Sequence, residues 1–471
     1  MSDGLLHCSA TELTRRIRDG SLGCAELMEE SLAGIARCNP QLNAIVSLDE
    51  DLARAGAETA DAALASDSSP GPLHGLPFAF KDLQLTAGIR TTRGSPLHAD
   101  FVPDTDSLVV ERIRAAGAIA IGKTNVPEFG AGSQTFNRVF GTTLNPYDPG
   151  KTCGGSSGGA AVALAARMLP LADGSDLGGS LRNPASFCNV IGFRPTPGRV
   201  PNHPQANLWF ELSTSGPMAR SIDDLALLLS VMAGPDPRSP TALTDPGTDF
   251  RGIEPLPLEA LKVAYSPDLG GLPVAPEIRE RIAQVAAQLS DMGVAVEEAC
   301  PDLHDATRVF HVLRAQTFRA RYSYLPPEQQ AQLKDTIIWN MQAGQQLTHE
   351  DLDQAWAART ALFDRVAEFF RHYDFLLGPT TQVLPFDIET PWVREIDGVP
   401  MADYLSWMQS CAQLTVTSCP ALSLPAGFSA DGLPIGAQLV APVREDLRLL
   451  RFAKTLEGEI SSAAQAPEIC T

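Results

Sequence analysis

Apolar residues recur at helical spacing near the start of the chain and predict two helices within residues 9–37. The positions that carry this pattern are Leu13, Ile17, Leu27, Leu32 and Ile35. Ser9 and Ser21 stand where N-caps are expected, because a serine hydroxyl accepts a hydrogen bond from the first turn of a helix. A strand is predicted at 43–48 and an alanine-rich helix at 50–65.

A loop rich in serine and proline at 66–74 precedes a segment dense in glycine and small residues, from 75 to about 200. The pattern there predicts, in order, strand 76–81, helix 106–116, strand 118–122, helix 158–168, strand 169–172 and a helix beginning near residue 178. Strands that alternate with helices are typical of an α/β fold in which helices cover both faces of a sheet.

The second half of the chain alternates further and contains one long helical stretch. The pattern predicts helix 222–233, strand 261–265, helix 276–291, strands 374–378, 420–425 and 435–440, and a final helix at 443–457. Residues 305–372 are expected to be mostly helical, with Trp339, Met341 and Trp356, and to form a lid or one wall of a pocket. No domain-separating linker and no internal repeat is found, so residues 1–471 are expected to form one domain.

Composition narrows the class of protein. Of the 471 residues, 44% are hydrophobic and 20% are charged, which is an ordinary globular composition. The formal net charge of −20 disfavours nucleic acid and anionic membranes as partners. No apolar run reaches the roughly 18 residues of a membrane span. The first residues lack a basic segment followed by an apolar one, so we expect no signal peptide.

The nine cysteines are odd in number and scattered, and no Cys-x-x-Cys pair occurs. This usage predicts reduced thiols in a cytoplasmic protein. The histidines form no pair at positions i and i+4, and no His-Glu-x-x-His motif occurs. We therefore expect no metal and no cofactor.

Three polar residues stand within runs of small residues where packing gives no reason for them: Lys81, Ser156 and Ser180. Glycine has no side chain to bury and loses much entropy when it is ordered. Two Gly-Gly-Ser turns in close succession therefore suggest backbone N–H groups brought close to a ligand, with a hydroxyl beside them. A nucleophile and an oxyanion hole are the equipment of acyl transfer.

Two familiar patterns match short segments of the chain. Residues Gly117–Thr124 fit the phosphate-binding pattern G-x-x-x-x-G-K-[ST]. A predicted helix precedes them, and Pro127 prevents a helix after them, so a buried strand is expected instead. Residues Gly154–Gly158 fit the G-x-S-x-G turn of α/β-hydrolases. That alternative requires an acid and a histidine downstream, and it leaves Lys81 and the second Gly-Gly-Ser unexplained. The histidines available to it are His203, His304, His311, His349 and His372.

Taken together, these segments resemble the amidase signature family. Its two glycine-rich motifs are matched by Gly154-Gly-Ser-Ser-Gly-Gly159 and by Gly174-Ser-Asp-Leu-Gly-Gly-Ser-Leu-Arg182. Ser156 and Ser180 lie 24 residues apart and Lys81 lies 75 residues before Ser156, and both spacings suit the family. Further family-like segments are Gly122–Phe129, Gly192–Gly198, Ser215–Arg220, Gly378–Thr381 and Gly432–Gly436.

The resemblance implies a large, mixed and twisted central β-sheet covered by helices on both faces. Within it, N-terminal helices at 9–65 precede a signature core at 75–220. A variable helical region that forms a lid or pocket follows at about 240–375, and strands and a helix at 376–460 complete the fold.

The resemblance also implies a role for each matched residue. Ser180 is implied to be the nucleophile, Ser156 a bridging serine after a cis Gly155–Ser156 peptide, and Lys81 the final base. A lysine must be neutral to accept a proton, and burial in an apolar strand lowers its pKa. The oxyanion hole is implied to use the backbone N–H groups of Leu177, Gly178, Gly179 and Ser180 at a helix N-terminus.

Three neighbours are implied to support these groups: Ser157 beside Lys81, and Asp176 and Arg182 within the serine loop. Leu177 departs from the family, where Thr or Ile is common at this position. Its backbone donor is kept, so the departure affects specificity more than catalysis. Cys153 is also unusual and is expected to be a small apolar filler.

A glycine-rich loop is expected beside the bridging serine, where its small residues leave room for a bulky or aromatic acyl group. This loop contains Phe129, Gly130, Ala131 and Gly132. Trp209, Phe210 and the helices of 305–372 are expected to supply apolar walls. No cluster of arginines is found near the site that would suggest a dicarboxylate substrate. The leading expectation is therefore a neutral, hydrophobic ligand.

The leading hypothesis is an amidase that hydrolyses carbon–nitrogen acyl bonds through an acyl-enzyme, on hydrophobic or aryl amides and anilides, with carbamates (urethanes) and esters as further substrates. The expected partners are a small-molecule amide or carbamate and water, without nucleic acid or membrane, in a monomer or homodimer. The alternative is the glutamine-hydrolysing subunit of a tRNA-dependent amidotransferase. That subunit usually has a Met-Asp-Glu-Phe-Ala-Met-Gly-like run where this chain has Val126–Gly132. A degenerate, non-enzymatic amide-binding scaffold is disfavoured because all three triad positions are filled.

Overall fold

The computed structural model describes residues 4–66 and 70–470. Residues 67–69, part of the expected loop 66–74, and residues 1–3, part of the segment searched for a signal peptide, lie outside the described residues. The eight cysteine side chains that are described are free thiols, and the side chain of Cys470 is outside the description.

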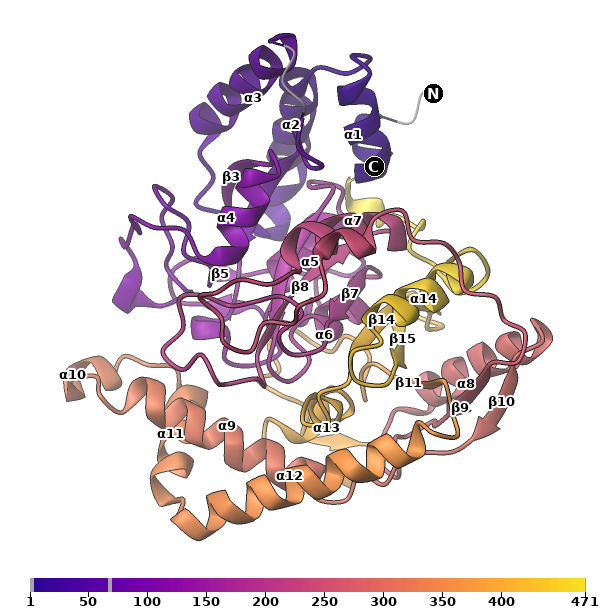
Figure 1. Cartoon of the computed structure of the whole chain (residues 1–471). Helices are drawn as coiled ribbons and strands as arrows, with labels where there is room; N and C mark the ends of the chain where they lie inside the picture. The colour runs from indigo at the N-terminus through magenta and orange to yellow at the C-terminus, as the bar shows by residue number, and fades with distance from the viewer. Residues whose placement is uncertain (1–3, 67–69, 471) are drawn as a thin grey trace.

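The N-terminal helices form the upper part of the molecule (Figure 1). They are α1 (Ala10–Arg18), α2 (Cys24–Leu42) and α3 (Glu50–Ala65). Ser9 caps α1 as expected, since its hydroxyl accepts from the Glu12 N–H at 3.1 Å. The expectation for Ser21 is wrong, because α2 begins at Cys24. There the Asp61 carboxylate of α3 accepts from the N–H of Cys24, a long-range cap that no local pattern reveals.

The centre of the molecule is a mixed eight-stranded sheet with the order β10-β9-β11-β15-β14-β7-β8-β6. β9 pairs in parallel with β10 and β11, and the other neighbours are antiparallel. The strands are β6 (Ala172–Asp176), β7 (Ile191–Arg194), β8 (Thr214–Ala219), β9 (Lys262–Tyr265), β10 (Ala295–Glu298), β11 (Phe375–Pro379), β14 (Ala421–Phe428) and β15 (Pro434–Val440).

A smaller three-stranded sheet lies beside the large one and carries the lysine. In it, β2 pairs in parallel with β3, and β1 pairs antiparallel with β3. The strands are β1 (Ile45–Val46), β2 (Pro77–Lys81) and β3 (Ile119–Thr124). The segment Gly117–Thr124, which fits the phosphate-binding pattern, therefore contains a strand, as expected. Its last residues, Gly122, Lys123 and Thr124, continue β3 without a turn. Two short pairs, β4 (Phe136–Asn137) with β5 (Gly141–Thr142) and β12 (Glu395–Ile396) with β13 (Val399–Pro400), complete the strands.

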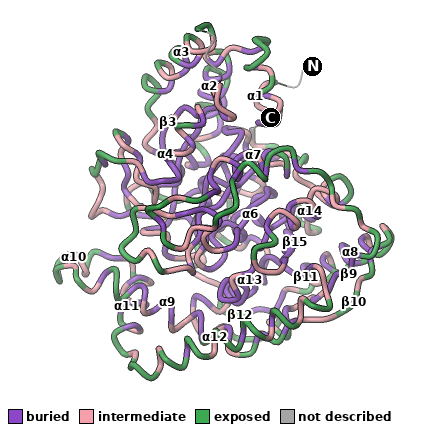
Figure 2. Tube along the Cα trace, viewed as in Figure 1, coloured by how far each residue is buried: buried purple, intermediate pink, exposed green. Residues whose placement is uncertain are grey.

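Helices cover both faces of the large sheet, since every residue of β7, β8, β11 and β15 is buried. Figure 2 shows this buried centre, with exposed residues along α3 and the outer helices. The covering helices are α5 (Gly158–Ala165), α6 (Arg182–Phe187), α7 (Ile222–Met232), α8 (Pro276–Asp291), α13 (Gln409–Thr415) and α14 (Asp446–Ile460), and α4 (Leu108–Ala115) packs against α7. The expected α/β fold with a mixed, helix-covered sheet is confirmed. Among the described helices, none is both long and apolar enough to cross a membrane.

The helical region expected at 305–372 is divided into four helices at the lower edge of the molecule, in orange tones in Figure 1. They are α9 (Ala306–Tyr322), α10 (Pro327–Gln330), α11 (Asp335–Gln346) and α12 (His349–Phe369). Among these four, α9 faces the serine loops, which are the loops that carry Ser156 and Ser180. Its Phe310 ring lies against Gly178 of the second loop, and a side-chain carbon at Gly178 would come 2.6 Å from Phe310 Cζ.

The predicted elements deviate most around the serine loops. The strand expected at 169–172 runs instead over 172–176, and the helix expected near 178 begins at Arg182. β6 is rich in polar residues, so hydrophobicity alone gave no signal for it. β7, β8, β10 and α13 were not predicted either.

Candidate active site

Lys81 ends β2 and is fully buried among serine oxygens. Its Nζ lies 2.9 Å from Ser156 Oγ, 2.8 Å from Ser157 Oγ and 3.0 Å from Ser175 Oγ, and it also donates to the Ser175 carbonyl at 3.2 Å. Burial lowers the pKa of Lys81 to about 7, although the negative charges of Asp173 and Asp176 oppose this shift. An amine with such a pKa is half neutral near pH 7 and is able to accept a proton from a hydroxyl.

Ser156 lies on a loop that approaches α5, and the Gly155–Ser156 peptide bond is cis, as the resemblance implies. Its neighbours are glycines because the chain passes very close to other segments. A side-chain carbon at Gly158 would come 2.2 Å from Thr135 Oγ1. Ser157 follows Ser156, contacts Lys81 and donates its N–H to the Ser180 carbonyl at 3.2 Å. This last bond ties the loop of Ser156 to the loop of Ser180.

The Ser180 loop wraps around the carboxylate of Asp176. The N–H groups of Gly179 and Leu181 donate to this carboxylate at 2.7 and 3.2 Å, and Arg182 pairs with it at 3.0 Å. Burial disfavours the charged form of Asp176, yet Arg182 and Arg194 outweigh burial and hold its pKa well below the usual range. The loop is thus fixed by a charged centre that stays ionised.

Fixing the loop in this way leaves some of its donors free. Among the described residues, the N–H groups of Leu177, Gly178 and Ser180 have no hydrogen-bond acceptor, whereas that of Gly179 is bound to Asp176. The Gly179 N–H is therefore engaged in this structure, and three of the four donors named from sequence remain free. Helix α6 begins only after this loop, at Arg182.

Ser156 and Ser180 open into the same pocket, whose volume is about 70 Å³. Ser180 is 8% exposed, so its hydroxyl reaches this space while the loop around it is sealed. Of the glycine-rich loop expected beside the bridging serine, Phe129, Gly130 and Gly132 line the pocket. Ala131 is buried instead against the α9 and α11 cluster.

The opposite wall comes from α9, which supplies Arg314, Phe318, Arg321 and Tyr322. The expectation that no arginines lie near the site is wrong. It could not be tested along the sequence, because these arginines lie more than a hundred residues beyond Ser180. Trp209, expected as an apolar wall, is 70% exposed, and Phe210 lies beside Arg321 in a neighbouring hollow.

Several residues that complete the site were not identified from sequence. Ser175 gives Lys81 two oxygen contacts, and the Asp173 carboxylate accepts from the Lys81 N–H at 2.8 Å. Both lie in the same Asp-Gly-Ser-Asp run as Asp176, so their position beside the motif was the available signal. Arg194, which donates to the Asp176 carbonyl, follows in the Gly-Phe-Arg segment.

No histidine lines this pocket among the described residues, and no group of three or more described His, Cys, Asp or Glu side chains is arranged to hold a metal ion. His311 is the histidine of α9, and it faces Asp403 at 3.9 Å rather than a serine. A serine–histidine arrangement is therefore not formed here, and lysine is the base that the geometry offers.

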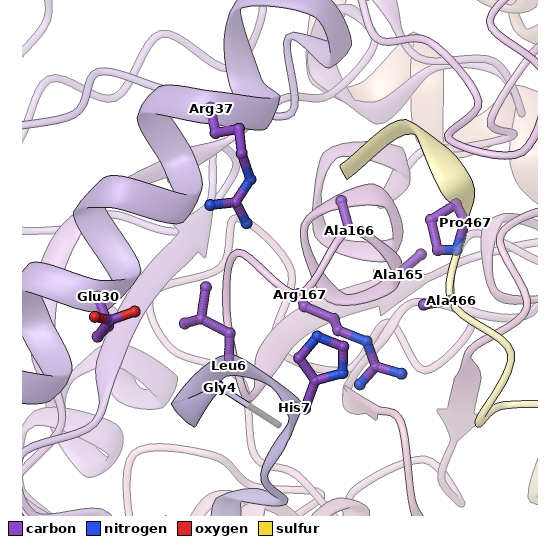
Figure 3. A pocket seen from close by; sticks show the side chains of 10 residues that line it. All are labelled: Gly4, Leu6, His7, Glu30, Arg37, Ala165, Ala166, Arg167, Ala466 and Pro467. Carbon is purple, nitrogen blue, oxygen red and sulfur yellow. The ribbon is translucent and has the colours of Figure 1, made fainter. Parts of the chain in front are cut away.

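A second, larger hollow of about 200 Å³ lies elsewhere, between α2, the end of α5 and the C-terminal segment (Figure 3). Figure 3 shows His7 beside Arg167, with Arg37 projecting from α2. Ser157 lies at the other end of α5, and a helix of eight residues is about 12 Å long. This hollow is thus separate from the serines and contributes nothing to their chemistry.

Comparisons with known proteins show the family and the fold. The chain matches the model of the Amidase family over residues 26–450. It is 35% identical over 477 residues to a glutamyl-tRNA(Gln) amidotransferase subunit of Synechococcus sp. (strain RCC307), covering 96% of this chain and 97% of that protein. It is 34% identical over 462 residues to an acylamidase of Rhodococcus erythropolis, covering 97% of each chain. The solved structure of a bacterial aryl acylamidase of the amidase signature family superposes with a TM-score of 0.89 at 27% identity, covering 98% of each chain.

Proposed function

The chain belongs to the amidase signature family, and on this premise we propose that it hydrolyses small-molecule amides through an acyl-enzyme on Ser180. The observation that carries the proposal is the contact of 2.9 Å between Lys81 Nζ and Ser156 Oγ, with Ser156 and Ser180 opening into one pocket. A neutral lysine beside a hydroxyl chain supplies the base that a serine nucleophile needs.

In the proposed reaction, Ser180 Oγ attacks the amide carbonyl carbon. Its proton passes to Ser156 Oγ while the Ser156 proton passes to Lys81 Nζ. The negative charge that develops on the carbonyl oxygen is bound by the free N–H groups of Leu177 and Gly178, supported by that of Ser180.

Collapse of the tetrahedral intermediate breaks the carbon–nitrogen bond. The proton returns along the same path to the leaving nitrogen, so the amine departs neutral and Ser180 is acylated. Water then attacks the acyl-enzyme with the same proton relay, which releases a carboxylic acid and restores the free serine.

The pocket supports an acyl group with an apolar body. The Phe129 and Tyr322 rings both line it and pack against each other with ring centroids 5.1 Å apart, and the Phe318 ring lies 5.7 Å from that of Tyr322. Aryl amides and anilides suit such a wall. Carbamates and esters pass through the same tetrahedral chemistry, and we include them in the proposed range.

A second candidate is a glutamine-hydrolysing component of an amidotransferase, which the 35% identity to the Synechococcus protein favours. In such a protein, ammonia released at the serine would be passed to a partner protein. This candidate predicts glutamine hydrolysis together with capture of a partner. An acylamidase needs neither.

A substrate panel tests the proposal directly. Purified protein is assayed with p-nitroanilides, primary amides, carbamates, esters and glutamine, and intact-mass measurement follows fluorophosphonate labelling. We expect hydrolysis of an amide or anilide and one label on Ser180. Absence of both hydrolysis and labelling would contradict the proposal, and glutamine as the one good substrate would favour the second candidate.

A further inference from the structure

One cation in the pocket wall is buried without an acidic partner. Arg314 is 4% exposed, and its Nε donates to Asn340 Oδ1 at 3.2 Å while its Nη2 donates to the Tyr404 hydroxyl at 3.0 Å. Both acceptors are neutral, and no ion pair joins Arg314 to a carboxylate in the part of the chain that the structure describes. A buried charge without a counter-ion is costly, so such a group indicates that a partner arrives from outside.

The free end of the guanidinium is available to that partner. The two hydrogen bonds use Nε and Nη2, and Nη1 takes part in neither. Nη1 is also not one of the polar side-chain atoms that are fully buried and lack a hydrogen-bond partner. The group is held in place by Asn340 and Tyr404 and by the Phe318 ring, whose centroid lies 4.4 Å from Arg314 Cζ. A guanidinium fixed at one side and open at the other is preorganised for a planar anion such as a carboxylate.

The face of α9 aims this group at the reacting centre. Phe310, Arg314, Phe318 and Tyr322 follow one another at four-residue spacing and therefore share one face of the helix. Phe310 lies against Gly178, a donor of the proposed oxyanion hole. Arg314 is one turn further along, about 6 Å in helix rise. A bound anion would thus lie a few bonds from the scissile carbonyl.

The charge of the pocket supports the same conclusion. The chain carries a net charge of −20, yet the described residues that line this pocket include two arginines and no aspartate or glutamate. Arg321, the second arginine, is exposed and lies toward the mouth, whereas Arg314 is buried at the inner end. A locally positive cleft in an acidic protein attracts an anionic substrate.

We propose that Arg314 binds a carboxylate on the acyl portion of the substrate, so that this amidase prefers half-amides of short dicarboxylic acids over neutral amides of the same length. The acyl side is favoured because Arg314 is one helical turn from Phe310, which lies against Gly178 of the proposed oxyanion hole, where the acyl carbonyl would bind. This inference rests on the proposed function of Ser180 as an acyl-forming nucleophile and adds its substrate class.

The test compares two chromogenic anilides of equal chain length, N-(4-nitrophenyl)succinamate and N-(4-nitrophenyl)butanamide. In the wild-type protein, we expect kcat/KM for the succinamate to exceed that for the butanamide by about 100-fold, as for a buried charge-assisted pair. Arg314→Met keeps the apolar stem and removes the charge, and it is expected to bring this ratio to about one. Arg314→Lys keeps the charge without the planar fork, so an intermediate ratio is expected.

Arg319→Met is the matched control, because Arg319 is an exposed arginine of the same helix whose Cβ lies toward Gly344 of α11. Its ratio should equal that of the wild type. A wild-type ratio near one overturns the inference, whether or not the Arg314 variants fold. The inference is also overturned if Arg314→Met lowers kcat/KM equally for both anilides, so that the ratio between them is retained.

Failure of the proposed function gives a different result. In that case neither anilide is hydrolysed and Ser180 takes no fluorophosphonate label. Hydrolysis of both anilides at equal rates, with Ser180 labelled, removes the carboxylate subsite and leaves the amidase.

Discussion

The two walls of the pocket are built in opposite ways. On the wall of Ser156 and Ser180, behind which Lys81 is buried, short side chains and glycines are locked by close contact. A side-chain carbon at Gly174 would come 2.4 Å from Leu181 Cδ2. On the wall of α9, long arginine and aromatic side chains project from a regular helix. The first wall fixes the atoms that react in the proposed mechanism, and the second presents groups that can be exchanged without disturbing them.

This comparison teaches where the reaction and the choice of substrate reside. A change in the first wall should slow every substrate by the same factor, because each uses the same nucleophile and base. A change in the second wall should alter the ratio between substrates. The predictions below test this division from the largest expected effect to the smallest, with the Arg314 ratio falling between the second and the third.

Ser180→Ala removes the proposed nucleophile and should lower kcat/KM by about 10⁴-fold or more for all substrates. The measurement is hydrolysis of the two anilides together with intact mass after fluorophosphonate treatment. Ser175→Ala is the control for labelling, since Ser175 contacts Lys81 but carries no proposed covalent role. This variant should still take the fluorophosphonate label. Retained labelling of Ser180→Ala would remove Ser180 from the nucleophile role.

Lys81→Met removes the base and should lower kcat/KM by about 10³-fold. In the proposed mechanism the proton acceptor is the neutral amine, and burial lowers the pKa of Lys81 to about 7. Activity should therefore rise as the pH increases through about 7 and then level off. The residual activity of Lys81→Met should lack this rise. A profile of kcat/KM from pH 5 to 9 measures both, and an unchanged profile in the variant would assign the titration to another group.

Asp173→Asn keeps the acceptor for the Lys81 N–H and removes a negative charge beside the amine. That charge favours protonated Lys81, so its loss should lower the pKa of Lys81 further. The rise of activity should move to lower pH, by about one unit, with a change of less than about tenfold on the plateau. Burial raises the pKa of Asp173 itself, so an unchanged profile would show that Asp173 is uncharged, and a shift to higher pH would show that it acts in another way.

Arg321→Met removes the exposed arginine at the mouth of the pocket. Charges in solvent interact weakly, so the preference for the succinamate should fall by only about two- to fivefold. This effect should shrink further at high ionic strength, whereas the contribution of buried Arg314 should persist. An Arg321 effect as large as that of Arg314 would place the anion at the mouth.

The predictable part of the fold follows from local patterning. Helix α8 was predicted at 276–291, as observed, because its apolar positions recur at helical spacing. β6 and the start of α6 were misplaced because their residues serve the site and not the core. The cap of α2 was misassigned to Ser21, since Asp61 reaches it from another helix.

The candidate site also has a part that the sequence predicted and a part that only the folded chain decided. Lys81, Ser156 and Ser180 could be named from motif spacing, and the structure brings Lys81 to Ser156 and both serines to one pocket. The role of each remains a prediction that the variants test. Which of the four loop N–H groups stay free depends on the Asp176 carboxylate and was decided by the folded loop.

The sequence by itself determined the mixed α/β fold, the family and the three polar residues of the proposed relay, because each depends on patterns within short stretches of chain. Only the tertiary structure decided what faces them. Arg314 lies 134 residues beyond Ser180 and belongs to an ordinary amphipathic helix, so nothing along the chain marks it. Its burial without an acidic partner appears only when α9 packs across the serine loops, since charge pairing between distant elements is a property of the folded chain.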